Sequence, residues 1–231
     1  MNQPFAVQLP TEGAYSRRVM FGIELLDAVT LSRVNQGVKV VADGLLGKPI
    51  INASGLFVWL QEDVANLRKV SIDPGALPYE RLEVDPGELN LPPVKPALTT
   101  IELQPKVGYS FTSGITGLRG ALIEEQVDPP EPSTPVPNAA VRLQWLDDDN
   151  HWRSAPTISH TDPKRGDFVS ILRLSSIEVP HLEQGEVTVR LLASRDGGLE
   201  RHSDNFRLPQ GRVTDPSTSN PLIFAWDELQ P

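Results

Sequence analysis

The stretch "HTDPKRGDF", residues 160–168, places a turn directly before the start of a strand, and "INASGLF", residues 51–57, does nearly the same. In each, an Asx residue precedes a glycine, and an aromatic residue then opens an apolar run. These positions are Asp162, Gly166 and Phe168 in one stretch and Asn52, Gly55 and Phe57 in the other. An Asx side chain accepts hydrogen bonds from nearby backbone amides, and glycine supplies the positive φ that starts the return strand. We interpret both stretches as one structural turn, with each phenylalanine as the first core-facing residue of its strand.

The surroundings of the two turns also repeat. "VNQGVKV" (34–40) aligns with "PNAAVRL" (137–143), so that a polar start and an alternating strand precede the turn each time. The connection from strand to turn is longer in the second copy, and its turn carries one extra residue. The same order of features at two places predicts two copies of one β module with different loop lengths.

Proline and glycine are frequent, with 22 and 17 residues in a chain of 231, which is typical of many turns and few long helices. Short apolar segments with period-two alternation recur between these turn formers, as expected of half-buried strands. The candidate strands are 19–26, 38–40, 56–61, 68–72, 79–84, 98–104, 115–123, 141–145, 168–174, 187–191 and 221–226. We predict an all-β fold of two tandem antiparallel β-sandwich domains, residues 1–106 with an N-terminal arm and residues 107–231.

This order of features resembles that of carboxypeptidase regulatory-like domains, which share the transthyretin-like, Ig-like β-sandwich. "PVPNAAVRL" with "TDPKRGDF" carries the resemblance in the second copy, and "NQGVKV", "NASGLF" and "LPYERLEV" carry it in the first. Asn52 replaces the usual aspartate, and the family's "G-Y" element, which follows the turn and precedes an outer strand, is absent as such from both copies. The resemblance implies the fold and a non-catalytic role as a spacer or ligand-holding module; it implies no reaction.

The linker between the two predicted domains is expected near residues 104–112, "QPKVGYSFT". The segment 124–138, "EEQVDPPEPSTPVPN", is richer in proline, but it falls between the first two strands of the second copy. We interpret it as a stiff surface loop with polyproline II character. This proline-rich loop and the N-terminal residues 1–18 are the candidate contact surfaces.

The formal net charge of −9 argues against non-specific binding to nucleic acid or to an anionic membrane, because such binding needs clustered lysine and arginine. The chain has no cysteine, which excludes a disulfide framework and thiolate chemistry. The N-terminus has no basic start followed by an apolar stretch, and no segment is apolar enough to span a membrane. We expect synthesis in the cytoplasm without a signal peptide and no membrane insertion.

Catalytic and metal-binding patterns are missing from the sequence. The four histidines, His151, His160, His181 and His202, show neither H-x-H nor H-x-x-x-H spacing. There is no G-x-S-x-G nucleophile motif and no phosphate-binding G-x-x-x-x-G-K-S/T motif. We therefore expect no enzymatic activity, no cofactor and no metal.

The acidic stretch "WLDDDN", residues 145–150, is the remaining candidate for ligand contact. Its Asp148 and Asp149, together with His151 and Trp152, could hold a sugar, since the indole would stack on the ring while the carboxylates bind hydroxyl groups. A hairpin tip explains the acidic residues better than a calcium loop, because the glycine and the closing bidentate acid of such a loop are absent. Packing of Trp152 in the fold is the alternative to its role in binding.

These features favour a non-catalytic structural or connector protein of a multi-protein assembly. A phage-tail-like or contractile injection particle would explain why a sandwich type that usually works outside cells lacks a signal peptide, since such a particle assembles in the cytoplasm and is released later. The expected partners are other proteins of that assembly. The alternative is a carbohydrate- or peptide-binding accessory module, which rests on the acidic stretch.

Overall fold

The computed structural model describes residues 19–60, 64–125, 133–174, 178–217 and 222–231. The predicted N-terminal arm and the centre of the proline-rich loop, residues 126–132, lie outside these ranges. The described residues form strands, turns and two short 3-10 helices, without an α-helix, so the predicted all-β class is confirmed. None of the described residues belongs to a helix long and apolar enough to cross a membrane.

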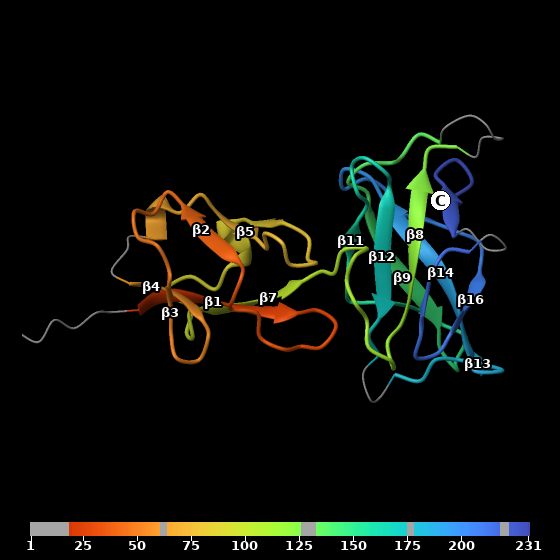
Figure 1. The fold of residues 1–231 in the computed structure, drawn as a ribbon, viewed down its shortest axis with the longest axis horizontal. Coiled ribbons are helices and arrows are strands. Elements are labelled where there is room, and N and C mark those ends of the chain that lie inside the picture. The colour runs from red at the N-terminus through yellow and green to blue at the C-terminus, as the bar shows by residue number, and fades with distance from the viewer. Residues whose placement is uncertain (1–18, 61–63, 126–132, 175–177, 218–221) are drawn as a thin grey trace, which may run out of the picture.

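Residues 19–103, called the first half, form two sheets, shown in red to yellow-green in Figure 1. One has the order β3-β4-β1-β7 and the other the order β2-β5-β6. The elements are β1 (Val19–Asp27), β2 (Lys39–Asp43), β3 (Ile50–Ile51), β4 (Phe57–Leu60), η1 (Val64–Asn66), β5 (Lys69–Asp73), β6 (Leu82–Val84), η2 (Pro86–Glu88) and β7 (Leu98–Leu103).

Residues 116–231, called the second half, also form two sheets, which lie beside the first half along the long axis of the molecule (Figure 1). In one sheet β9 and β14 are central, and in the other β8 pairs with β12, β17 and β18. The elements are β8 (Thr116–Ile123), β9 (Ala140–Leu146), β10 (Trp152–Ser154), β11 (Ser159–His160), β12 (Asp167–Leu172), β13 (Leu182–Glu183), β14 (Glu186–Ser194), β15 (Arg201–His202), β16 (Phe206–Pro209), β17 (Val213–Thr214) and β18 (Ile223–Ala225).

The strand pairing of the first half recurs in the second. In the first half β1 lies between β4, which is antiparallel to it, and β7, which is parallel. In the second half β8 pairs with β12 in antiparallel and with β17 and β18 in parallel orientation. The opposite sheets repeat as well, since β2-β5-β6 corresponds to β9-β14-β16. The strand order is therefore duplicated along with the turn.

The parallel pairs correct the expectation of purely antiparallel sheets. Each parallel pair joins the first strand of a half to one of its last strands. A parallel pair requires a connection of a dozen or more residues, and here the intervening strands of the other sheet provide it. The alternation of apolar residues shows which face of a strand is buried but does not reveal its direction relative to a neighbour.

The turn of the first half is built around the side chain of Asn52. Its Oδ1 accepts hydrogen bonds from the amides of Ser54, at 3.0 Å, and of Leu56, at 2.9 Å. Gly55 has a φ of 77°, which few other residues adopt without strain. Phe57 follows as the first residue of β4 and is only 2% exposed.

The turn of the second half uses Asp162 in the same way. Its Oδ1 accepts hydrogen bonds from the amides of Lys164, at 2.9 Å, and of Arg165, at 3.0 Å. Gly166 has a φ of 70°, and Phe168 in β12 is only 1% exposed. The extra residue of this turn is accommodated between the Asx residue and the glycine, so the φ sign and the burial of the phenylalanine are unchanged.

The buried apolar residues form two clusters, one for each half. The cluster of the first half includes Trp59, which stacks on Phe21 at 4.6 Å between ring centroids, and that of the second half includes Trp145. Two residues from outside the first half belong to its cluster, namely Tyr109 and Ile171 of β12. The halves therefore share apolar contacts across their boundary.

The joining segment, residues 104–115, is held at the end of β1 by a buried carboxylate. Oδ2 of Asp27 accepts hydrogen bonds from the hydroxyl groups of Tyr79 and Tyr109, and Oδ1 accepts them from the amides of Val29 and Thr30. Burial raises the pKa of Asp27, but these four hydrogen bonds together lower it below the ordinary value. The boundary predicted after residue 106 thus lies in a segment whose Tyr109 is bound to the first half.

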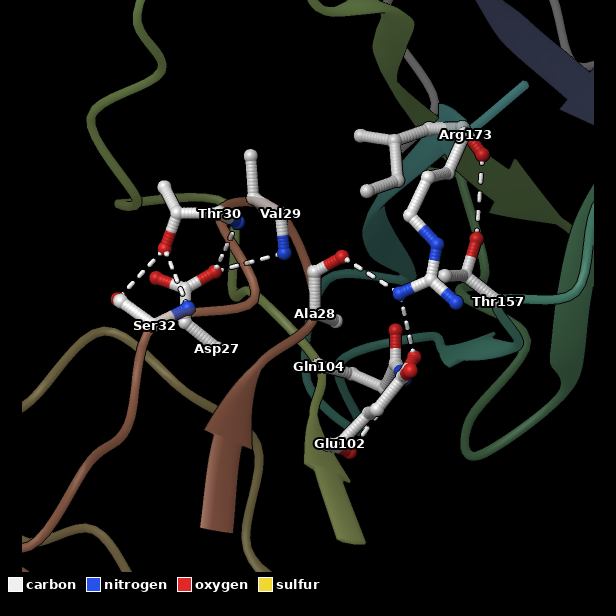
Figure 2. Close-up of polar contacts among 10 residues, drawn as sticks. Asp27, Ala28, Val29, Thr30, Ser32, Glu102, Gln104, Thr157 and Arg173 are labelled. Atoms are coloured by element: carbon white, nitrogen blue, oxygen red, sulfur yellow. Dashed lines mark hydrogen bonds and ion pairs between the residues drawn. The ribbon is translucent and has the colours of Figure 1, made fainter. Parts of the chain in front are cut away.

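An arginine of the second half adds a polar contact between the halves. Nη1 of Arg173 lies 2.8 Å from Oε2 of Glu102 and 3.3 Å from the carbonyl oxygen of Ala28 (Figure 2). Close by, the hydroxyl of Thr157 donates to the carbonyl oxygen of Ile171 at 3.1 Å. Arg173 thereby binds the ends of both β1 and β7.

Gly166→Ala should destabilise the protein more than Gly197→Ala. Both glycines have a positive φ, but a Cβ atom at position 166 would lie 2.2 Å from the carbonyl oxygen of Leu122, whereas position 197 has no atom within 4 Å. The backbone around Gly166 must therefore shift, and we expect an additional loss of about 2 kcal/mol in the free energy of unfolding. Equal losses in urea denaturation of the two variants would contradict this account of the turn.

Candidate functional site

The acidic stretch forms the tip of the hairpin between β9 and β10, and Asp147 organises it. Oδ1 of Asp147 accepts hydrogen bonds from the amides of Asp149, at 3.0 Å, and His151, at 2.7 Å. Its Oδ2 accepts one from Nε of Arg153 at 2.8 Å. The hydrogen bond from the amide of His151, followed by that from Arg153, lowers the pKa of Asp147. The residues predicted from the sequence were its exposed neighbours Asp148 and Asp149, and this buried turn residue was not among them.

Asp147, Asp149 and His151 are the group of metal-ligating side chains that the described part of the chain brings together, with ligand atoms within 4.8 Å of one another. Both oxygens of Asp147 are already hydrogen-bond acceptors within the turn. Acidic residues that close a turn in this way need no cation, so this geometry is explained by the hairpin itself.

We predict that millimolar calcium changes the Tm by less than about 1 °C, because a ligand that binds only the folded state raises its stability and this hairpin offers calcium few free oxygens. Thermal melts with and without calcium measure the effect. Asp149→Asn serves as the control, since it removes one of the remaining carboxylates. A rise of several degrees that this variant abolishes would make the hairpin a calcium site.

Trp152 lies in β10 and is half-buried. The guanidinium group of Arg190 lies over its ring, 4.4 Å from the centroid. Nε of Arg190 also donates to Oε1 of Gln144 at 2.7 Å, which fixes the arginine in this position. One face of the indole is therefore covered by a cation–π contact, and a sugar could stack only on the other.

The remaining acid of the predicted group, Asp148, faces His181, with 3.5 Å between Oδ1 of the aspartate and Nδ1 of the histidine.

A cavity of about 800 Å³ lies between the two halves and is a better candidate for a binding site. We call it the cleft. Glu80 and Arg81 line it from the first half, Lys106 from the joining segment, and residues 160–165 from the second half. Its apolar lining is Pro105, Val107, Pro163, Phe168 and Val169. This volume falls within the range of about 300–1,000 Å³ that is usual for ligand pockets, which often form between domains.

Glu80 and His160 connect the two walls of the cleft. The backbone amide of His160 donates to Oε1 of Glu80 at 2.9 Å, and the His160 Nδ1 lies 3.1 Å from Oε2. The hydrogen bond with Glu80 raises the pKa of His160, while burial opposes this shift. Asp162, predicted only as a turn residue, lies in the same wall as His160.

The Glu80–His160 contact should make stability depend on pH. Because the pKa of His160 is raised by folding, its stabilising effect is complete below the unfolded value of about 6.5 and is lost as the pH rises through the folded value. We expect the Tm difference between the wild type and His160→Gln to be larger at acidic pH than at alkaline pH. Thermal melts across this range measure it, with Glu80→Gln as a second variant. A difference that does not vary with pH in either variant would contradict the pairing.

The cleft could not be predicted from the sequence, because its residues have no common motif. Glu80 and His160 are eighty positions apart, and Lys106 lies in the segment interpreted only as a linker. No spacing rule connects such positions before the halves are placed side by side. The one available signal was the pair of basic residues within the turn of the second copy, Lys164 and Arg165, which the first copy lacks.

Comparisons with known proteins give no match: no family model, curated protein or solved structure is significantly similar to this chain. The resemblance to carboxypeptidase regulatory-like domains stays a prediction from the turn-and-strand pattern.

Proposed function

We propose that this chain is a non-catalytic structural or connector protein of a multi-protein assembly, such as a phage-tail-like or contractile injection particle. In this proposal residues 1–106 and 107–231 are two tandem β-sandwich domains of the transthyretin-like type. The protein is made in the cytoplasm and incorporated into a particle that is released. Its partners are the other proteins of that particle.

The observation that carries the proposal is the set of contacts between the halves. Ile171 of the second half packs into the apolar cluster of the first, Arg173 binds Glu102, and Glu80 binds His160. Domains joined only by a linker move relative to one another by default. These apolar and charged contacts between residues of the two halves instead hold the halves in one arrangement, as a connector requires.

The exposed edge of the first half supports the same role. β3 is the edge strand of its sheet, and Ile50 and Ile51 are 48% and 49% exposed. Leu46, in the preceding loop, is fully exposed. An edge strand with apolar side chains is a site at which a partner can add a strand or an apolar surface. In addition to β3, the N-terminal arm and the loop 124–138 stay predicted contact surfaces.

The alternative is a carbohydrate- or peptide-binding accessory module. Binding of a carbohydrate would depend on stacking against Trp152, and Arg190 covers one face of that ring, which weakens the support for this alternative. Its peptide form is supported by the cleft and does not conflict with a connector, since connectors bind segments of their neighbours.

The connector proposal predicts that the tagged wild-type chain, expressed at its natural level in its own cells, is recovered in a high-mass fraction with a fixed set of other proteins. Ile51→Lys should reduce this recovery strongly while leaving the Tm within about 1 °C, because a charge on an exposed edge blocks strand addition without disturbing the core. Val179→Lys is the matched control, since Val179 is 57% exposed in the second half.

Affinity purification followed by size-exclusion chromatography measures these outcomes. Recovery of the wild type as a lone monomer would overturn the connector proposal. Undiminished recovery of Ile51→Lys with its partners would instead remove β3 from the contact surface.

A further inference from the structure

Three basic side chains of the cleft have no side-chain partner among the residues that the structure describes. Lys106, Lys164 and Arg165 are exposed, and their side chains make no hydrogen bond or ion pair within the described ranges. Some other exposed arginines do have partners, since Arg153 binds Asp147 and Arg207 binds Glu183, whereas Arg68, outside the cleft, has none within the described ranges. These three cations of the cleft are therefore not engaged in hydrogen bonds or ion pairs that stabilise the described part of the fold.

The basic side chains that line the cleft outnumber its acids, and two of these acids already accept hydrogen bonds from the protein. Both oxygens of Glu80 are engaged by His160. Oδ1 of Asp162 accepts the two amides of its own turn. Four basic side chains, Arg81, Lys106, Lys164 and Arg165, line the cleft against three acids, Glu80, Asp162 and Asp167. The cleft thus carries a local positive excess in a chain whose net charge is −9.

The backbone that bears the three cations is fixed by hydrogen bonds. The amide of Gly166 donates to the carbonyl oxygen of Asp162 at 2.8 Å, which closes the turn that carries Lys164 and Arg165. The amide of Lys106 donates to the carbonyl oxygen of Pro78 at 2.9 Å. A ligand would order side chains only, so that the loss of backbone entropy on binding is small.

The form of the cleft points to an extended ligand with several negative charges. Lys106 lies on the joining segment, whereas Lys164 and Arg165 lie in the wall of the second half, and Pro105 and Val107 provide apolar surface beside them. A single small anion gains little from charges on separate walls. A peptide can place carboxylates against both walls while its aliphatic atoms rest on the prolines and the valine.

We propose that the cleft binds an acidic segment of a partner protein, whose aspartate and glutamate carboxylates pair with Lys106, Lys164 and Arg165. This inference rests on the connector role and gives the chemistry of one of its contacts. Carboxylates match both the lysine ammonium groups and the planar guanidinium group of Arg165.

Fluorescence anisotropy with two labelled peptides tests the proposal. One peptide alternates glutamate and alanine, and the other carries glutamine at every glutamate position. At low ionic strength the folded full-length chain should bind the glutamate peptide about tenfold more tightly than the glutamine peptide. The double variant Lys164→Gln/Arg165→Gln should bind the glutamate peptide about tenfold more weakly than the wild type does.

Lys48→Gln/Arg68→Gln is the matched control, because both residues are exposed, have no side-chain partner within the described ranges, and lie outside the cleft. It should bind as the wild type does, and all variants should keep the wild-type Tm. Equal binding of the two peptides, or an equal loss of affinity in the two double variants, would overturn the proposal. Displacement of the peptide by inorganic phosphate, but not by chloride of the same ionic strength, would also overturn it and identify a phosphate site.

The outcome is separable from that of the connector test. Recovery of the wild type in an assembly, together with unchanged recovery of Lys164→Gln/Arg165→Gln and no preference for the glutamate peptide, would reject the cleft proposal alone. A lone monomer in cell extracts would reject the connector role, whatever the peptides do.

Discussion

The buried carboxylate of Asp27 fixes the segment on which the arrangement of the two halves depends. It lies at the end of β1 and accepts four hydrogen bonds, of which the one from Tyr109 reaches the joining segment. From the other side, Arg119 of β8 donates to the carbonyl oxygens of Val107 and Tyr109. A buried charge is tolerated only when its oxygens are satisfied, so a shift of the joining segment would leave Asp27 without one of its donors.

This constraint gives the cleft its geometry. Lys106 projects from the joining segment, and the segment is bound to both halves at positions 107 and 109. The Glu80–His160 contact joins the wall from the first half to the wall from the second, and Arg173 adds a further contact between the halves. A site made of exposed side chains can thus be well defined, because each side chain starts from backbone that packing and hydrogen bonds hold in place.

The two copies of the turn have different surroundings although their backbones agree. The first lines a cavity of about 850 Å³ together with aliphatic residues and the prolines of 92–96, and it carries alanine and serine between its asparagine and glycine. The second carries Pro163, Lys164 and Arg165 at that place and faces the first half. Hydrogen bonds of the Asx residue and the φ of the glycine fix the turn, so the residues between them are free to differ in charge.

The sequence by itself determined the all-β class, the positions of the main strands and the turn that recurs before Phe57 and Phe168, because these depend on alternation and on local hydrogen bonds between residues near in the chain. It also excluded thiolate chemistry, since no cysteine is present. Only the tertiary structure decided the parallel pairing of β1 with β7, the four-fold hydrogen bonding of Asp27 and the meeting of Glu80 with His160. These contacts join residues far apart in the chain, and their partners are selected by the packing of one half against the other, for which a single sequence has no local signal.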